Sequence, residues 1–136
     1  MNKANKEVVM LTLAEKIKLA KNPLTEPSFL RALERNEKNL KVQILVAKHP
    51  NSDFELLDKL SRHNDYSVKA VVAANPNVGN ETQARLGGSS EVIVLLNVAT
   101  NPKTPAFVLE KLIKHKNDVV RDAAKKNLRN NKYIIK

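Results

Sequence analysis

The sequence predicts an all-α fold in which short two-helix units stack side by side, and two observations support this prediction. First, an Asn-Pro or His-Pro pair recurs every 26 or 27 residues, with its proline at Pro23, Pro50, Pro76 and Pro102. Second, a valine follows each proline by 18 or 19 residues and a leucine follows it by ten. A fixed period of this length is typical of stacked supersecondary units, because each unit buries its apolar side against its neighbours.

The chain has 136 residues, which suits a single repeat domain. We expect about four and a half units of 26–27 residues over 22–127, an N-terminal cap over 1–21 and a C-terminal cap over 128–136. Hydrophobic residues make up 42% and charged residues 28%, and the chain has no cysteine. Neither a membrane-spanning stretch nor a secretory leader is recognisable, so the expected location is the cytoplasm.

The elements follow in order along the chain. A helix over 12–21 precedes the first proline, and the first helix of each later unit begins just after its proline. Ser52 opens the pattern Ser-Asp-Phe-Glu, a capping box, and Asn80 opens a similar one. Thr104 is expected to cap the fourth unit, with Pro105 at the first helical position. Leucines then recur at helical spacing.

The second helix of each unit is expected to begin after Asn39, Asp65, Ser90 and either Asn117 or Asp118. These helices span barely two turns and could wind as 3₁₀ in places. Each ends at the residue before the proline, because a following proline disfavours the α conformation there. Asparagine also tolerates a left-handed closing conformation. An alanine three positions before each proline would let neighbouring units approach closely.

Three segments carry a more specific pattern: VKAVVAANP at 68–76, NPKTPAFVLEKL at 101–112 and NDVVRDAA at 117–124. This pattern resembles the leucine-rich repeat variant family. The resemblance covers roughly residues 12–128. It implies a right-handed superhelix of α-helices alternating with short α- or 3₁₀-helices, related in shape to HEAT and armadillo solenoids. Some family members carry an iron–sulfur module held by cysteines, and the absence of cysteine excludes that cofactor here.

The net charge is +10, and half of this excess lies in the last eighteen residues. Basic residues stand beside three of the repeating valines and again in the last unit, and they are the candidate sites for anions or nucleic acid: Lys41, Lys69, Arg121, Lys125 and Lys126. A ladder of one cation per unit could follow a phosphate backbone. The alternative is that Lys69 pairs with Asp65, and Arg121 with Asp118, along their own helices.

Other candidate features have structural explanations. His63 and His115 are expected in polar turns between helices, His49 takes the place of an asparagine, and no metal site is predicted. Gly87 suits the end of a helix, although a loosened third unit could also hinge the array. Tyr133, Ile134 and Ile135 could cover the last unit.

Catalytic signatures are absent, so no catalytic residue and no cofactor is predicted. The expected function is a non-enzymatic scaffold that binds another protein through an extended helical face. The alternative is a nucleic-acid-binding solenoid with a basic C-terminal surface.

Overall fold

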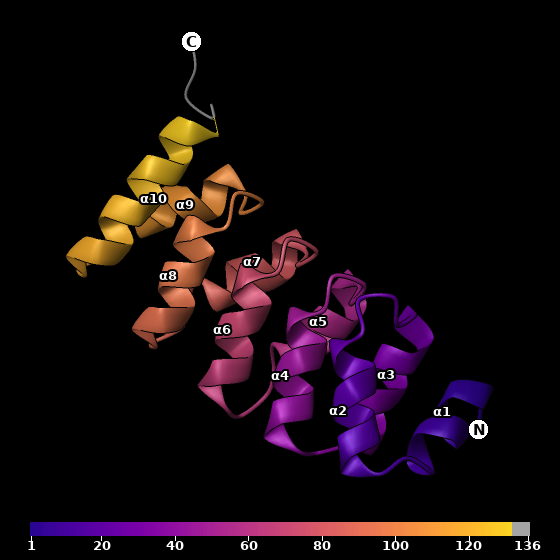
Figure 1. Ribbon diagram of the computed structural model, residues 1–136. Helices are drawn as coiled ribbons and strands as arrows, with labels where there is room; N and C mark the ends of the chain where they lie inside the picture. The colour runs from indigo at the N-terminus through magenta and orange to yellow at the C-terminus, as the bar shows by residue number, and fades with distance from the viewer. Residues whose placement is uncertain (132–136) are drawn as a thin grey trace.

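The computed structural model of the chain describes residues 1–131, and this part of the chain folds into α-helices without a β-strand. In chain order the helices are α1 (Lys3–Val9), α2 (Leu13–Lys21), α3 (Pro27–Asn36), α4 (Leu40–Lys48), α5 (Phe54–Leu60), α6 (Tyr66–Ala74), α7 (Asn80–Leu86), α8 (Val92–Thr100), α9 (Ala106–Leu112) and α10 (Asp118–Asn130). Successive pairs of helices stack in a row, which confirms the predicted all-α solenoid (Figure 1).

The helices form two rows (Figure 1). We call α2, α4, α6, α8 and α10 the second helices, since each ends a pair, and each packs closely against the next. The first helices α5, α7 and α9 pack mainly against second helices, α3 packs against α1 as well as α4, and α3, α5, α7 and α9 pack less closely against one another. The solenoid is therefore tight on the second-helix side and open on the first-helix side. α1, which the sequence analysis did not assign, packs against α3 and extends the first row.

The repeating apolar positions form one continuous core. The repeating valines are fully buried, and so are the leucines seven and ten residues after the prolines, which are all at most 3% exposed: Leu30, Leu33, Val42, Leu57, Leu60, Val68, Leu86, Val94, Leu109, Leu112 and Val120. The alanines three positions before the prolines are also buried, at Ala20, Ala47, Ala73 and Ala99. The period read from the sequence therefore sets the correct core register.

The asparagine before each repeat proline joins its unit to the preceding one. Asn75 is buried, and its Nδ2 donates to Ala47 O at 2.9 Å and to His49 O at 3.2 Å. Asn101 and Asn127 make the equivalent two hydrogen bonds in the following units. Asn127 does so inside α10, which continues because no proline follows it. The pair is thus a link between units as well as a helix stop.

His49 makes two of the three contacts that Asn75 makes at the equivalent position. Its Nε2 lies 2.7 Å from Asn22 O, and its Nδ1 accepts from Asn51 N at 2.9 Å. A carbonyl oxygen only accepts hydrogen bonds, so the ring proton of this tautomer is on Nε2. Residues before the repeat prolines have φ between −66° and −76° and extended ψ, so the left-handed conformation is not used.

Side-chain hydroxyls two residues after the prolines form a second set of buried links. Thr25, Ser52 and Thr104 donate to the carbonyl oxygen six residues earlier at 2.6–2.7 Å. Because Ser52 and Thr104 are used in this way, their predicted capping roles are wrong. The structure caps α5 with Asp53, whose side chain accepts from Leu56 N.

Other predicted helix starts have mixed outcomes. Asn39, Asp65 and Asn117 cap second helices as predicted. Asn80 lies inside α7, whose N-cap is Gly79, and Ser90 is replaced by Glu91 at the start of α8. Pro105 precedes the first helical residue of α9. The second helices are α-helical, without the 3₁₀ turns considered above.

The third repeat departs from the pattern at two buried positions. Val78 stands where the other units have Thr or Ser and cannot donate a hydrogen bond, and Gln83 occupies a leucine position with 0% exposure. Gln83 Nε2 donates to Thr104 Oγ1 at 2.8 Å, but its Oε1 has no hydrogen-bond partner. Gly87 ends α7 as predicted; a Cβ there would lie 3.1 Å from Val108 Cγ1.

The two ends of the array differ from its interior. Lys125 occupies the position of the buried alanines, and it is exposed on α10. Residues Tyr133, Ile134 and Ile135 lie outside the described residues. Within 1–131 no helix has both the length and the hydropathy needed to span a bilayer.

The asparagine links should contribute measurably to stability. We expect Asn75→Ala to lower the free energy of unfolding by about 1–3 kcal/mol, because it leaves the buried Ala47 carbonyl without its side-chain donor. His49→Asn is the matched control and should be neutral within about 0.5 kcal/mol, since asparagine makes these contacts elsewhere. Urea denaturation followed by circular dichroism measures both, and an unchanged midpoint for Asn75→Ala would contradict the assignment.

Substitutions that restore the repeat residues in the third repeat should stabilise the fold. We expect Gln83→Leu to raise the free energy of unfolding by about 1 kcal/mol, because it removes a buried unpaired oxygen and restores the leucine position. Val78→Thr adds the missing hydroxyl, and the double variant should be the most stable of the set. Thermal and urea unfolding of the four proteins in this mutant cycle measures the effect. A double variant less stable than the wild type would show that the polar arrangement is itself favourable.

Candidate interaction surface

The outer side of the second helices exposes large apolar side chains at equivalent positions of successive units. The side chains of Leu40, Tyr66, Val92 and Ile93 are each 40–53% exposed. Half-buried apolar neighbours line the same side one turn further along each helix. We call this set the second-helix surface: Leu13, Ile17, Leu40, Ile44, Leu45, Tyr66, Val71, Val92, Ile93, Leu96 and Val119. Because second helices pack side by side, these residues form one strip along the row.

The composition of these helices is unusual for a solvent-facing element. α8 has the sequence VIVLLNVAT, with no charged residue, although part of it faces solvent. A helix that is apolar all round is normally covered by other parts of the protein or by a partner. Contiguous exposed apolar surface of this kind marks interaction sites. The second-helix surface is therefore the strongest binding candidate among the described residues.

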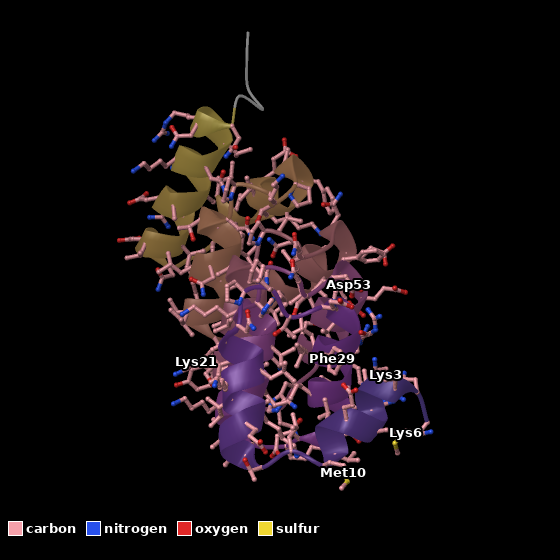
Figure 2. All side chains as sticks on the ribbon, turned by 45° about the vertical axis from the view of Figure 1, so that its right-hand side comes forward. Lys3, Lys6, Met10, Lys21, Phe29 and Asp53 are labelled. Carbon is pink, nitrogen blue, oxygen red and sulfur yellow. The ribbon has the colours of Figure 1, made fainter. Side chains whose placement is uncertain are left out.

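Acidic side chains are absent from the three middle helices of this surface, although Glu15 in α2, Glu91 before α8 and Asp118 in α10 lie beside it. α4, α6 and α8 contain no acidic residue. Lys18, Lys21, Lys41 and Lys48 accompany the apolar side chains of α2 and α4. Figure 2 shows Lys21 pointing away from the stack, whereas Phe29 lies between α2 and α3. The N-terminal half of the surface thus combines apolar contact area with positive charge.

The basic residues singled out from the sequence do not form one ladder. Lys41 precedes its valine and is exposed on the second-helix surface, whereas Lys69 and Arg121 follow theirs and point toward the turn before their own helix. Arg121 donates to Asp118 Oδ1 at 2.5 Å and to His115 O at 3.0 Å, which confirms the predicted pairing. Asp65, in contrast, accepts from Ser67 and forms no ion pair with Lys69.

Lys125 and Lys126 are exposed on α10 at the C-terminal end of the array. They lie several helices away from Lys41 and Lys69, so the five candidates belong to at least three separate regions. A continuous basic stripe is not built from them. The repeat alignment already sets Lys41 apart, because it precedes its valine whereas Lys69 and Arg121 follow theirs. What these side chains contact is decided only by the packing of the units.

The first-helix side is crossed by polar contacts between units. Asp58 of α5 accepts from the Thr82 hydroxyl of α7 at 2.6 Å and pairs with Arg85 of α7 and, at 3.5 Å, with Arg62. The hydrogen bond from Thr82, together with the charges of Arg85 and Arg62, lowers the pKa of Asp58 below its ordinary value of 3.8. These residues line a groove of about 730 Å³ between α5 and α7.

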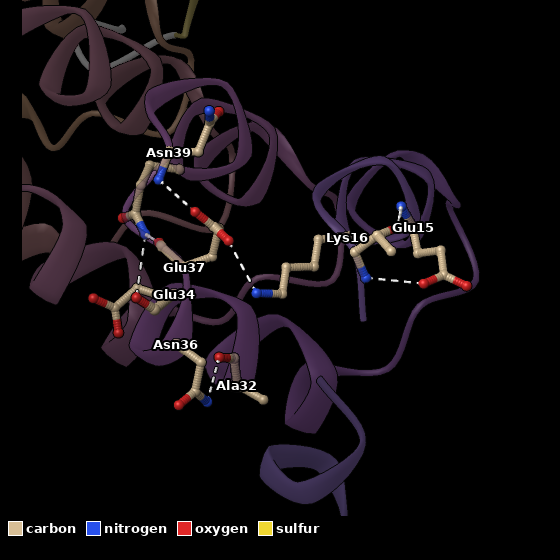
Figure 3. A network of polar contacts seen from close by, with 9 residues as sticks. Glu15, Lys16, Ala32, Glu34, Asn36, Glu37 and Asn39 are labelled. Carbon is tan, nitrogen blue, oxygen red and sulfur yellow. Dashed lines mark hydrogen bonds and ion pairs between the residues drawn. The ribbon is translucent and has the colours of Figure 1, made fainter. Parts of the chain in front are cut away.

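Similar contacts join other units. Lys59 pairs with Glu34 at 2.8 Å and Arg31 with Asp53 at 2.9 Å. Figure 3 shows Glu37 between Lys16, whose Nζ donates at 2.9 Å, and the backbone N–H of Asn39. Those two bonds lower the pKa of Glu37. Each acid in these contacts already has a basic partner, so the first-helix side is better explained by stacking than by ligand binding.

The histidines have structural roles. His63 and His115 accept at Nδ1 from the backbone N–H two residues later, at 2.9 and 3.0 Å, within the polar turns predicted for them. Residues 1–131 contain no group of three potential metal-ligating side chains.

Comparisons of the chain with protein-family models, with curated proteins and with solved structures find no match.

The candidate interaction residues that sequence reasoning missed are the apolar ones. Tyr66, Val92 and Ile93 precede the repeating valines, and the period gave them no role. The sequence did contain a signal for them. A nine-residue second helix cannot bury every side chain against two neighbouring second helices and the row of first helices. The uncharged α8 segment therefore had to expose apolar side chains.

The link between α5 and α7 predicts a pH dependence. The pKa of Asp58 is lower in the folded than in the unfolded chain, so its contribution to stability is present above about pH 4 and is lost as the pH falls through the folded pKa. We expect Asp58→Asn to lower the free energy of unfolding by about 1 kcal/mol at pH 7 and by progressively less at acid pH. Asp122→Asn, at an exposed and unpaired carboxylate, is the control. Urea titrations across pH measure both, and an effect of Asp58→Asn that is constant with pH would contradict the assignment.

Proposed function

We propose that this protein is a non-enzymatic scaffold that binds another protein through the second-helix surface. The observation that carries the proposal is the exposed apolar strip over α4, α6 and α8, which lies on three consecutive units and includes a helix without any charge. Stacking explains the burial of one side of each second helix, but it does not explain apolar residues on the opposite side. A bound partner would remove that area from water.

The partner that fits this surface is an acidic segment with apolar side chains at regular spacing. α4 carries Lys41 and Lys48, and α4, α6 and α8 contain no carboxylate. Positive charge of this kind attracts a negatively charged partner and disfavours a basic one. Apolar side chains of the partner would fill the spaces between successive helices, as in the helix-in-groove mode of recognition.

The proposal also includes cytoplasmic location and the absence of catalytic activity. Membership of the leucine-rich repeat variant family stays a prediction from the repeat pattern. The nucleic-acid alternative rests on the net charge of +10. It is the weaker candidate because its basic residues lie in separate regions of the fold.

Peptide selection tests the proposal directly. We expect peptides selected on the wild-type chain from a displayed library to be acidic and amphipathic. Their affinity, measured by fluorescence anisotropy, should fall by about tenfold or more with Ile93→Asp, which places a charge in the apolar strip. Phe107→Asp is the matched control, since this side chain is similarly exposed but lies on α9 in the first-helix row.

Two results would contradict the proposal. One is that Ile93→Asp and Phe107→Asp affect the selected peptides equally. The other is a mobility shift of generic duplex or single strands that is lost steeply with salt and weakened by Lys125→Gln with Lys126→Gln, which would favour the nucleic-acid function.

A further inference from the structure

A cavity opens between two neighbouring inter-helix turns, residues 61–66 and 86–91. Its volume is about 380 Å³, and its lining includes three cationic side chains: Arg62, Lys69 and Arg85. Tyr66 and Glu91 line it as well. Because Tyr66 also belongs to the second-helix surface, the cavity adjoins the apolar strip.

The position of Lys69 points to an absent acceptor. At the equivalent place in the preceding unit, Gln43 Nε2 donates to Glu34 O and Glu37 O at 3.1 and 2.5 Å. In the last unit Arg121 donates to His115 O and to Asp118. Lys69 reaches the same region of its own unit and is half-buried, yet its ammonium group has no hydrogen-bond or ion-pair partner in residues 1–131.

The cations around the cavity are unevenly paired. Arg62 and Arg85 share the single carboxylate of Asp58. Asp65, in the turn before Lys69, accepts from Ser67, and Glu91 lines the cavity without an ion pair to Lys69. Lys69 is therefore left without an acceptor at hydrogen-bond distance among the described residues. A carboxylate accepts hydrogen bonds from ammonium and guanidinium groups.

The cavity exists because one of its two turns has small residues. Gly88 and Ser90 stand where the next unit has Lys114 and Lys116. Gly88 has no contact closer than 3.5 Å to the position a Cβ would take. Long side chains at these places would fill the space in front of Lys69. The third repeat thus differs from its neighbours in a way that leaves a cationic cavity open.

We propose that this cavity binds a carboxylate, donated to by Lys69 and by the guanidinium of Arg62. The carboxylate belongs to the acidic segment that lies on the second-helix surface, and this part of the proposal rests on the proposed function. Tyr66 would contact the segment on the apolar side, while the carboxylate enters between the turns. Either an aspartate or glutamate side chain or a chain-terminal carboxylate supplies this chemistry.

The cavity can be tested with small carboxylates, without knowledge of the partner. The experiment titrates N-acetylglutamate α-amide, which offers a side-chain carboxylate, and N-acetylleucine, which offers a terminal one, into the ¹⁵N-labelled full chain at constant ionic strength. We expect saturable amide shifts confined to residues 61–66 and 86–91, with a roughly millimolar dissociation constant. The arm with the tighter binding identifies the source of the carboxylate.

Two variants distinguish specific binding of a carboxylate in the cavity from its nonspecific attraction to positive charge. Lys69→Gln should weaken binding by about tenfold or more, whereas Lys111→Gln, at an exposed lysine on α9 outside both the cavity and the second-helix surface, should leave it unchanged. The proposal is overturned by the absence of saturable shifts in both arms, by equal effects of the two variants, or by much tighter binding of inorganic phosphate. Each of those results leaves the peptide-selection test of the second-helix surface unaffected, so the two proposals can fail separately.

Discussion

Two buried hydrogen bonds from one asparagine amide to the preceding unit hold three successive turns of this structure in place. The donor at Asn75 reaches the carbonyl oxygens of Ala47 and His49, and the same geometry returns 26 residues later at Asn101 and again at Asn127. An unpaired buried carbonyl is costly, so each unit is completed by its successor. The links also fix the spacing between units. The donor and its acceptors lie in successive turns, and those turns must stay within hydrogen-bond distance of each other. This constraint explains why histidine can replace asparagine at position 49. Its two ring nitrogens take the places of the amide's donor and acceptor.

The tight and open sides of the solenoid follow from this link. Second helices end at the linked turns and pack closely, so their inward faces need valine and alanine. First helices lie further apart, and the space between them is bridged by longer polar side chains such as Lys59 with Glu34. Charged contacts are tolerable there because the side chains stay partly in water. The outer side of the second helices is under neither constraint. Its half-buried side chains, such as Ile44 and Val71, also pack against the core, so folding explains part of its apolar character. For the exposed side chains, binding of a partner is the explanation that we propose.

The third repeat is where the structure departs furthest from its own pattern. Val78 lacks the hydroxyl, Gln83 puts an amide into the core, and the turn that follows is shortened to glycine and serine side chains. The next unit compensates in part, since Thr104 accepts from Gln83. Departures from a repeat that cost stability are expected at functional places, and this unit contributes both the uncharged α8 and one wall of the cationic cavity.

The sequence by itself determined the fold class, the period and the core. The prolines, valines and leucines recur at fixed distances, and burial against identical neighbours is the only way such a period can be satisfied. It also located Asn39 and Asp65 as caps and narrowed the last cap to Asn117 or Asp118, because capping depends on residues two or three positions away. Only the tertiary structure decided the roles that depend on contacts between units. Ser52 and Thr104 have the local sequence pattern of N-caps. Their hydroxyls instead donate to carbonyls six residues earlier. Lys41 and Lys69 are separated, and Tyr66, Val92 and Ile93 are brought together, by helix orientation in the stack. A local pattern fixes which residues lie on one side of a helix, but packing decides which side meets water.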